Sequence, residues 1–406
     1  MNKELVITEY KNRILTGLYE SGTLAEIYFE DPDCEPILGN IYIGKIQSVV
    51  KNINAAFVEI SPGLLGYYSL TDNKNHIFIN SKKNDIPVAG DDILVQVAKE
   101  NIKTKAPVLT SSINYPGKYL VLTEFKKGIG ISNKIKDSGE RSHLKDLLLP
   151  YANENYGFIV RTNAKDAPDN DILYEASRLL VSRNNLMETC KYKTCFTLIK
   201  KGVTTVERLI RDLGENGLTR ITTDLPQMFE ELSRILSLGV FEDNICLDFY
   251  TDKSLPLIKL KNLETAVSHL LKEQVWLKSG AYIVIQPTEA FVVIDVNTGK
   301  YTGKKDLEDT FLKINLEAAE EIARQTRLRN LSGILLIDFI DMKDPKNKQA
   351  LLNALSKAFS KDPVKTVVVD MTALNLVEVT RKKERRPLHE QLGTICPVCK
   401  GRGYLF

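Results

Sequence analysis

Two apolar strands on either side of a long helix constrain this chain most. Residues 290–297, AFVVIDVN, and residues 333–342, GILLIDFIDM, are typical of buried strands, and residues 307–329 between them carry apolar side chains at helical spacing. Strands joined by one crossover helix run parallel and lie close together in a sheet. A second helix at 348–359 and a strand at 365–372 continue the alternation, which predicts an α/β architecture.

Carboxylates stand at the ends of both strands. Side chains alternate along a strand, so Asp295 and Asn297 share one face of the first, while Asp338 ends the apolar run of the second and Asp341 follows. A carboxylate inside an apolar strand is costly unless it is paired or bound to a metal. Asp295 and Asp338 are therefore candidate ligands of Mg²⁺, which is held by one or two carboxylates, waters and substrate phosphate oxygens.

This donor set suits hydrolysis of a phosphodiester, because a bound Mg²⁺ acidifies a water, polarises the phosphoryl oxygens and stabilises the leaving oxygen. The alternative is that the aspartates are ordinary strand-end residues that cap turns, which applies above all to Asp341 and to Asp295 taken alone. A histidine-based ribonuclease is disfavoured, since the 4 histidines show no pairing in the sequence. Walker and G-x-S-x-G motifs are also absent.

Residues 39–115 predict a small closed barrel of five short strands separated by Gly, Pro, Asn and Asp. Phe57, Tyr67 and Tyr68 fall in its second and third strands, where aromatic rings can stack on unpaired bases. Lys51 and Lys105 nearby favour binding of nucleic acid. The alternative is that the aromatic side chains belong to the barrel core.

Two further motifs point to bound ligands. Cys396 and Cys399, in CPVC followed by KGRG, form a zinc half-site, which the same pair from a second protomer would complete; free thiols or a redox pair are the alternatives. Arg161-Thr162 closes the strand GFIVRT, and arginine matches a terminal phosphate through paired hydrogen bonds. Taken alone, this signal is weak, and a surface ion pair is the better explanation of Arg161.

Composition excludes several other classes of protein. The chain has 406 residues, a net charge of +3, 43% hydrophobic and 26% charged residues, which excludes a disordered or fibrous chain and predicts two to four domains. Apolar runs stay shorter than the roughly 18 residues of a membrane helix. The 6 scattered cysteines do not form a disulfide scaffold, and the charged start is unlike a signal peptide, so we expect a cytoplasmic protein without membrane contact.

In their order along the chain, these motifs resemble a known family. GNIYIGKI with NAAFVEI and GYYSL is similar to an S1 RNA-binding domain. GFIVRT, IDVNTGKYTG, NLEAAEEIARQTRLRNLSGILLIDFIDM and CPVCKGRG then follow in the order found in the ribonuclease E/G family. The resemblance covers essentially the whole chain, and the helix with its IDFIDM strand is its most specific part.

The resemblance implies a multidomain α/β fold with an all-β S1 (OB-fold) barrel and with RNase H-like and deoxyribonuclease I-like subdomains. The implied parts are an RNase H-like subdomain in two pieces (1–35 and 215–278), the S1 domain (36–118), a 5′-sensor region (119–214), a deoxyribonuclease I-like catalytic subdomain (279–390) and a zinc-link (391–406).

The resemblance also implies a function. The implied protein is a Mg²⁺-dependent endoribonuclease that cleaves single-stranded RNA, in ribosomal RNA processing, messenger RNA decay or both. A 5′-monophosphate on the RNA is expected to stimulate cleavage. Asp295 and Asp338 match the magnesium ligands, and Asn297 matches the asparagine that orients the site. The expected RNA-binding residues are Phe57, Tyr67 and Lys105 at the barrel and Arg161, Thr162 and Lys365 at the 5′ sensor.

Cys396 and Cys399 match the zinc-link, with Zn²⁺ shared between protomers. The chain stops soon after this motif, before the small domain of the family, so we expect a homodimer and no degradosome scaffold. The alternative function is a non-catalytic S1-type RNA-binding protein with a degenerate active site. A deoxyribonuclease is disfavoured by the S1 signature.

Overall fold

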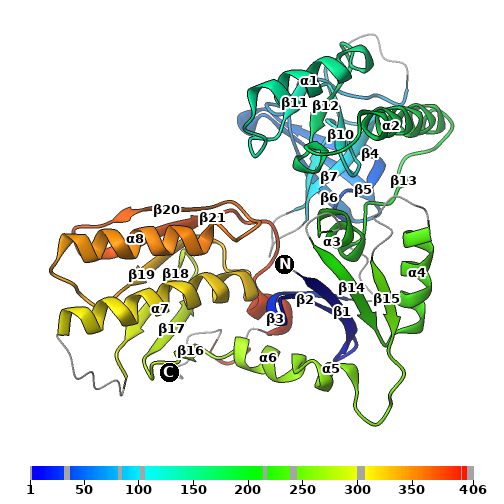
Figure 1. Ribbon diagram of the computed structural model, residues 1–406. Coiled ribbons are helices and arrows are strands. Elements are labelled where there is room, and N and C mark those ends of the chain that lie inside the picture. The colour runs from blue at the N-terminus through cyan, green and yellow to red at the C-terminus, as the bar shows by residue number, and fades with distance from the viewer. Residues whose placement is uncertain are drawn as a thin grey trace. The chain divides into compact units, whose positions relative to one another are not determined.

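The computed structural model divides into two compact units, shown in Figure 1. It describes residues 2–31, 37–80, 85–100, 106–213, 217–237, 245–299, 307–394 and 396–399. The first unit comprises Met1–Asp33, Thr219–Glu230 and Cys246–Phe406, and the second comprises Cys34–Leu218 and Glu231–Ile245. Within the described ranges, no helix has the length and apolar character needed to cross a membrane.

The first unit begins with an antiparallel meander. Its turns at Lys11-Asn12 and Ser21-Gly22 all have positive φ, as two-residue hairpin turns require. Two distant strands extend this sheet to the order β15-β14-β1-β2-β3. The elements are β1 (Lys3–Tyr10), β2 (Arg13–Glu20), β3 (Thr23–Glu30), β14 (Leu218–Thr223), β15 (Cys246–Phe249), α5 (Leu257–Leu260) and α6 (Leu263–Leu270), with α9 (Leu388–Leu392) near the end of the described chain.

A second sheet of the first unit has the order β16-β17-β18-β19-β21-β20. Its strands are β16 (Gln274–Trp276), β17 (Tyr282–Pro287), β18 (Phe291–Asn297), β19 (Gly333–Asp338), β20 (Thr366–Met371) and β21 (Leu376–Arg381). β18 and β19 are parallel and are joined through α7 (Leu307–Leu328), which confirms the crossover predicted from the sequence. α8 (Pro345–Phe359) begins three residues before the predicted start, because Asp344 caps it and Pro345 takes its first position.

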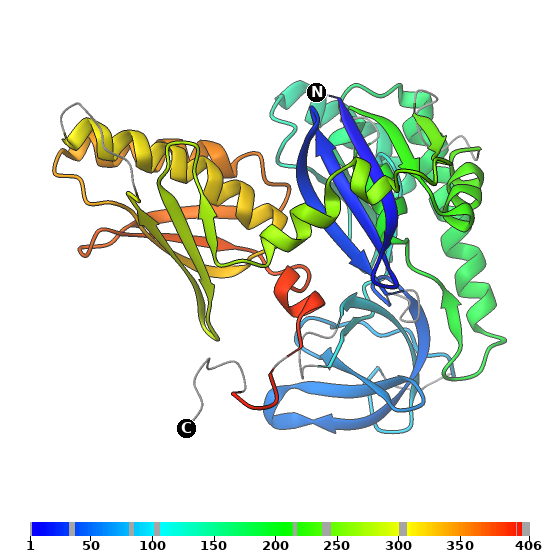
Figure 2. The same cartoon turned by 90° about the horizontal axis from the view of Figure 1, so that it is seen from below.

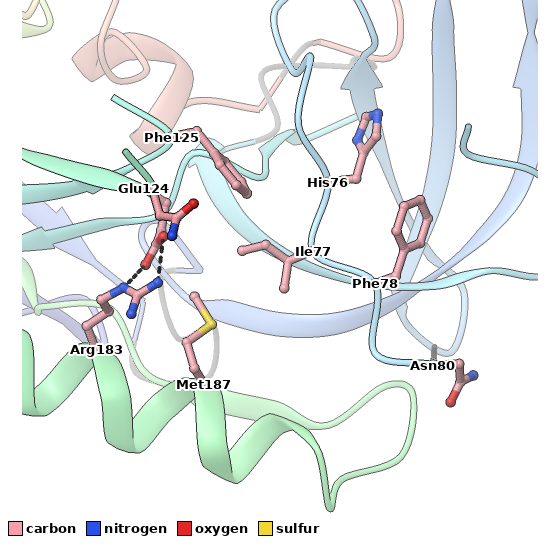
Figure 3. A pocket seen from close by; sticks show the side chains of 9 residues that line it. His76, Ile77, Phe78, Asn80, Glu124, Phe125, Arg183 and Met187 are labelled. Carbon is pink, nitrogen blue, oxygen red and sulfur yellow. Dashed lines mark hydrogen bonds and ion pairs between the residues drawn. The ribbon is translucent and has the colours of Figure 1, made fainter. Parts of the chain in front are cut away.

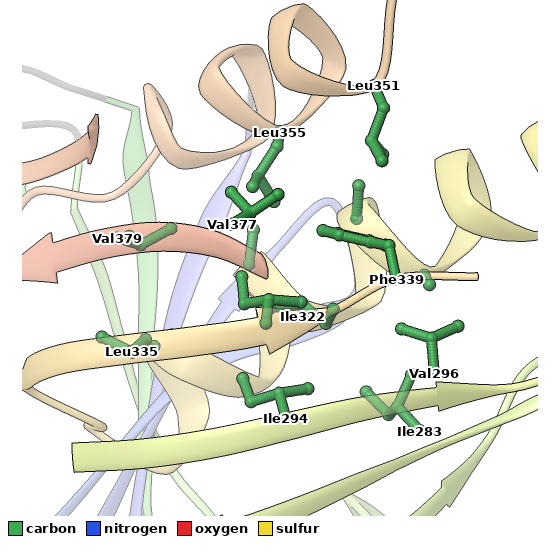
Figure 4. Packing of buried hydrophobic residues seen from close by; sticks show 14 of the residues in the cluster. Ile283, Ile294, Val296, Ile322, Leu335, Phe339, Leu351, Leu355, Val377 and Val379 are labelled. Atoms are coloured by element: carbon green, nitrogen blue, oxygen red, sulfur yellow. The ribbon is translucent and has the colours of Figure 1, made fainter. Parts of the chain in front are cut away.

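α7 and α8 cover one face of this sheet, and the core lies between them (Figure 4). Alternate strand residues such as Ile294, Leu335 and Val377 are buried there against Ile322 and Leu355. The other face is left exposed along β18 and β19, because period-2 alternation turns every second side chain away from the helices. Asp295 and Asp338 stand on that exposed face.

The second unit contains the predicted closed barrel (Figure 2). Its five strands are β4 (Ile41–Val50), β5 (Ala55–Ser61), β6 (Leu64–Ser69), β7 (Asp92–Lys99) and β8 (Val108–Thr110), and the pairing of β4 with β7 closes the ring. β13 (Leu198–Lys200) adds to β4 from outside the ring. This topology is consistent with an S1 OB-fold.

A four-stranded sheet, β11-β12-β10-β9, follows the barrel. The elements of this region are β9 (Asn114–Pro116), β10 (Leu120–Glu124), β11 (Ile129–Ile131), β12 (Tyr156–Val160), α1 (Ser138–Leu148), α2 (Asp169–Cys190) and α3 (Thr205–Leu213), while α4 (Pro226–Ser237) has residues in both units. Short 3₁₀ turns occur at Lys51–Ile53, Leu149–Tyr151 and Thr162–Ala164. The assignment of the first unit to RNase H-like and deoxyribonuclease I-like subdomains, and the six-part division of the chain, remain predictions.

Candidate active site

Asp295 and Asp338 meet at the carboxyl ends of β18 and β19. They are direct register partners in the parallel pair, and both are exposed on the face opposite the helices. Asn297 lies two residues after Asp295 on the same face, and its Nδ2 donates a hydrogen bond of 2.7 Å to Asp295 Oδ2. The structure therefore brings the three predicted catalytic residues together.

Negative charge gathers at this edge of the sheet. Partial burial, with the carboxylates of Asp295 and Asp341 nearby, raises the pKa of Asp338. A divalent cation would relieve that repulsion. Among the residues that the structure describes, no group of three or more His, Cys, Asp or Glu is placed to hold a metal. Two carboxylates with an amide fit Mg²⁺, which keeps waters and binds substrate oxygens, better than they fit a closed protein cage.

Asn315 supports the site from within α7. Its side chain is fully buried, its Nδ2 donates to the carbonyl of Ile340 at 2.8 Å, and its Oδ1 accepts from the amide N–H of Ile340 at 3.1 Å. This pair of hydrogen bonds fixes the chain two residues after Asp338. Our sequence reasoning missed Asn315; the signal was a polar residue next to Ile314, within the apolar stripe of the helix.

Asp341 is held by a different set of side chains. Asn375 Nδ2 donates to Asp341 Oδ1 at 3.0 Å, and Lys348 Nζ donates to Asn375 Oδ1 at 2.6 Å. Asn375 has a φ of 61° in the turn between β20 and β21, a conformation that asparagine tolerates. Asp341 therefore fits the structural alternative weighed for it in the sequence.

Arg161, the predicted phosphate ligand, follows β12 in the second unit. Its Nη1 donates to the carbonyl of Gly117 at 2.9 Å, and its Nη2 forms an ion pair of 2.5 Å with Asp212. Thr162 begins a short 3₁₀ turn, and its hydroxyl lies 3.1 Å from the hydroxyl of Ser132. An ion pair, the alternative considered for Arg161, is thus present in this structure.

Arg211 brings a second guanidinium to the same carboxylate, with its Nε 3.5 Å from Asp212 Oδ1. Burial, together with the charges of Arg161 and Arg208, lowers the pKa of Arg211 although Asp212 opposes that shift. Positive charge therefore exceeds negative charge in this cluster of Arg161, Arg208, Arg211 and Asp212. Sequence reasoning missed Arg211, whose only signal was its position in a short amphipathic helix. Lys365, assigned to the same sensor, is exposed in the first unit, and its role stays a prediction.

The barrel presents two of its three aromatic candidates. Phe57 on β5 and Tyr67 on β6 are register partners, with ring centroids 6.3 Å apart and planes at 74°, and both are partly exposed. Tyr68 is fully buried, and its hydroxyl lies 2.7 Å from His76 Nδ1, so the core alternative holds for that residue. Lys105, predicted to bind RNA, lies outside the described residues.

A concavity in the second unit lies between a loop of the barrel and α2 (Figure 3). Its wall includes His76, Phe125 and Met187 together with an ion pair of 2.6 Å between Arg183 and Glu124. None of the predicted site residues lines it. The ion pair joins α2 to β10, which gives these charged groups a structural role.

Cys396 and Cys399 lie in the last described segment, the first exposed and the second partly buried. They can supply two of the four ligands that Zn²⁺ needs. Completion of a zinc site by a second protomer stays a prediction.

Comparison with known proteins assigns the chain to a family. The model of the Ribonuclease E/G family matches residues 114–384, which is more than half of the chain. Ribonuclease G of Escherichia coli (strain K12) is 34% identical over 99% of this chain and 84% of that protein. Ribonuclease G of Haemophilus influenzae is 34% identical over 98% of the chain and 83% of that protein, and ribonuclease E of a Nostoc species is 32% identical over 95% and 58%.

Proposed function

The chain belongs to the ribonuclease E/G family and is an endoribonuclease, and from this premise we propose that Asp295 and Asp338 form a Mg²⁺ centre that cleaves single-stranded RNA. The observation that carries the proposal is the direct pairing of the two carboxylates across β18 and β19, on an open face of the sheet. Two carboxylates facing each other at strand ends, with the pKa of Asp338 raised by partial burial and by the charges of Asp295 and Asp341, are characteristic of a site built for a cation.

Asp295 and Asp338 would hold the metal. When bound, Mg²⁺ would supply positive charge to the phosphoryl oxygens and lower the pKa of a bound water. Asn297 holds the carboxylate of Asp295 through its 2.7 Å hydrogen bond and so fixes the direction of its oxygens. The open face admits a flexible strand of RNA, and Phe57 and Tyr67 on the barrel offer rings on which unpaired bases stack.

We propose further that the arginine cluster binds the 5′-monophosphate of the substrate. Arg161 and Arg211 share the single carboxylate of Asp212, which leaves net positive charge for an anion. A terminal phosphate accepts paired hydrogen bonds from guanidinium groups and would compete with Asp212 for them. Binding one end of the RNA raises the local concentration of the rest of the strand at the site of cleavage.

The expected substrates follow from the proposed cleavage of single-stranded RNA. Ribosomal RNA precursors and messenger RNA both offer single-stranded segments, so processing and decay of RNA are the expected roles. A homodimer joined by Zn²⁺ through Cys396 and Cys399 is the expected assembly.

The test is cleavage of a 3′-labelled, AU-rich single-stranded RNA that carries either a 5′-monophosphate or a 5′-hydroxyl. Reactions contain Mg²⁺ or EDTA and compare the wild type with Asp338→Asn and, as a matched control, Asp370→Asn, an exposed aspartate on β20. We expect internal cuts that need Mg²⁺, that disappear in Asp338→Asn and that persist in Asp370→Asn. Faster cleavage of the monophosphate RNA, with the preference reduced in Arg161→Met, supports the sensor.

Cleavage that continues in EDTA or in Asp338→Asn would overturn the metal centre. Tight RNA binding without cuts under every metal tried would instead favour the non-catalytic RNA-binding protein, with the aspartates as structural residues.

A further inference from the structure

Two aromatic side chains lie side by side next to the carboxylates. Trp276 on β16 and Tyr282 on β17 are register partners, with ring centroids 5.2 Å apart and planes at 58°. Trp276 is 59% exposed, although tryptophan side chains are usually largely buried in a folded protein. Neither residue has a part in the chemistry described above.

The pair shares a row of the sheet with the active site. Tyr282 is the register partner of Asn297, and Val284, the next residue on that face of β17, is the partner of Asp295. Ile283 points the other way, into the core under α7, which places Trp276, Tyr282 and Asn297 together on the open face. With neighbouring strands about 4.8 Å apart, the rings lie one and two strands from Asn297.

We propose that Trp276 and Tyr282 form a stacking platform for an unpaired base of the RNA, next to the bond that is cleaved. This inference rests on the proposed metal centre, because it takes Asp295 and Asp338 as the point of cleavage. Every base has a π-face, so aromatic side chains bind single strands with little dependence on sequence. A duplex keeps its bases stacked on one another, so the platform also selects for single-stranded substrate.

A second copy of the chain is the rival occupant of this surface. The open face carries Asp295, Asp338 and the partly exposed Glu378 among its apolar residues. The cores of protein interfaces are depleted in charged residues, and burying these carboxylates against another protein would leave them unpaired. A single RNA base would cover the rings without burying these carboxylates, which stay open to water and free to hold a cation, so the surface fits RNA better than a second copy.

Trp276 is the 1 tryptophan of the 406 residues, so its fluorescence reports on the platform alone. The first experiment titrates single-stranded RNA into full-length Asp338→Asn protein in Mg²⁺, where no turnover is expected. We expect saturable quenching of the tryptophan emission, with a midpoint equal to the dissociation constant from the anisotropy of labelled RNA. Binding by anisotropy with unchanged tryptophan emission would overturn the proposal.

Variants separate stacking from a structural role. In Trp276→Ala we expect KM for single-stranded RNA to rise roughly tenfold with a smaller change in kcat, since one stacked base is lost. Trp276→Phe keeps a ring and should recover most of the loss. Tyr192→Ala removes an aromatic side chain that is 83% exposed, two residues after the end of α2, and serves as the control, with kinetics near wild type. Equal effects of Trp276→Phe and Trp276→Ala would contradict stacking.

Removing single bases from the RNA substrate identifies the base that stacks on the platform. RNA oligomers with one abasic nucleotide at each position around the cleavage site are compared in the wild type and in Trp276→Ala. We expect one position at which loss of the base weakens binding to the wild type but not to Trp276→Ala, as a coupled pair in a double-mutant cycle requires. Equal effects in both proteins at every position would overturn the proposal.

The experiments distinguish this inference from the proposed function. Quenching without Mg²⁺-dependent cleavage would contradict the proposed metal centre but support the platform as an RNA-binding site. Mg²⁺-dependent cleavage lost in Asp338→Asn, without quenching, would keep the centre and remove the platform. A fall in mass by light scattering in Trp276→Ala would assign the surface to a second copy instead.

Discussion

Glu26 is a buried carboxylate in β3 that two arginines and a tyrosine hold in its ionised form. Arg327 Nη2 on α7 lies 2.6 Å from Glu26 Oε1, Arg385 lies 3.9 Å away, and the hydroxyl of Tyr28 donates to Glu26 Oε2. Burial alone would raise the pKa of Glu26, but these partners together lower it from its ordinary value of 4.5. The group joins the meander to α7 within the first unit.

This ion pair predicts a pH dependence of stability. Because the pKa of Glu26 is lower in the folded than in the unfolded chain, its stabilisation is complete above the unfolded value and is lost as the pH falls through the folded one. Glu26→Gln should lose about 3 kcal/mol near neutral pH. Its unfolding free energy in urea should then fall less steeply than that of the wild type between about pH 5 and pH 3. Parallel curves for the two proteins would contradict this account.

Asp338 and Asp341 show how far sequence reasoning reaches at the level of residues. Asp338 is the last residue of β19 and Asp341 follows that strand; the strand pattern correctly placed Asp338 next to Asp295. The partner of Asp341 is Asn375, 34 residues away on a turn that no local pattern connects with it. Arg161 and Asp212 are likewise 51 residues apart. The strand faces of these residues could be predicted from the sequence. Their hydrogen-bond and ion-pair partners, which show whether a residue has a structural or a functional role, could not.

Among the elements, α7 does more than join two strands. Its buried Asn315 satisfies both backbone groups of Ile340 and so orders the segment that carries Asp338 and Asp341. The helix thus couples the packing of the core to the placement of the carboxylates.

Asn315→Ala should therefore affect both stability and activity. Loss of the two hydrogen bonds leaves the partly buried N–H and carbonyl of Ile340 without their side-chain partner and should cost about 1–3 kcal/mol of unfolding free energy. We expect kcat to fall while KM for RNA changes little, because the binding surfaces are intact. Asn353→Ala, an exposed site on α8, should change neither quantity. A stability loss with unchanged kcat would mean that Asn315 does not position the site.

Substitutions that remove an aromatic ring from the barrel strands β5 and β6 should weaken RNA binding. Phe57→Ala should weaken binding of single-stranded RNA by about 1–3 kcal/mol, the value of one stacked base. Tyr67→Phe keeps its ring and should bind like the wild type. Fluorescence anisotropy with labelled RNA measures both constants, and equal binding by Phe57→Ala and the wild type would assign Phe57 to the structure of the barrel.

The elements themselves were largely predictable where their pattern was regular. The five barrel strands and α7 follow from apolar periodicity and turn residues. Helical periodicity in the sequence runs from residue 172 to about residue 201, but α2 stops at Cys190, and residues 198–200 form β13 against the barrel. Pairing with a distant strand decided the conformation there, and local propensity does not encode it.

At the scale of the whole molecule, the expected assembly depends on two thiols. If Cys396 and Cys399 share Zn²⁺ with a second protomer, Cys396→Ser with Cys399→Ser should shift the protein from dimer to monomer and release its zinc. Cys246→Ser, at an exposed cysteine of the first unit, should change neither property. Light scattering with metal analysis measures both, and an unchanged mass in the double variant would exclude the zinc-link.

The two-unit organisation could not be derived from local patterns. The first unit is assembled from three separate stretches of chain, and β14 joins β1 across some 200 residues of sequence. Composition and length allowed several domains, and the family resemblance named their parts. Which stretches pack together depends on long-range contacts, which local sequence patterns do not encode.

The most direct test of the metal centre is binding of Mn²⁺, a paramagnetic substitute for Mg²⁺, followed by electron paramagnetic resonance. The account predicts a site that is present in the wild type and in Asp370→Asn, and that is lost or strongly weakened in both Asp295→Asn and Asp338→Asn. Binding of equal strength in all four proteins, each folded by circular dichroism, would contradict the claim that these two strand-end carboxylates hold the metal.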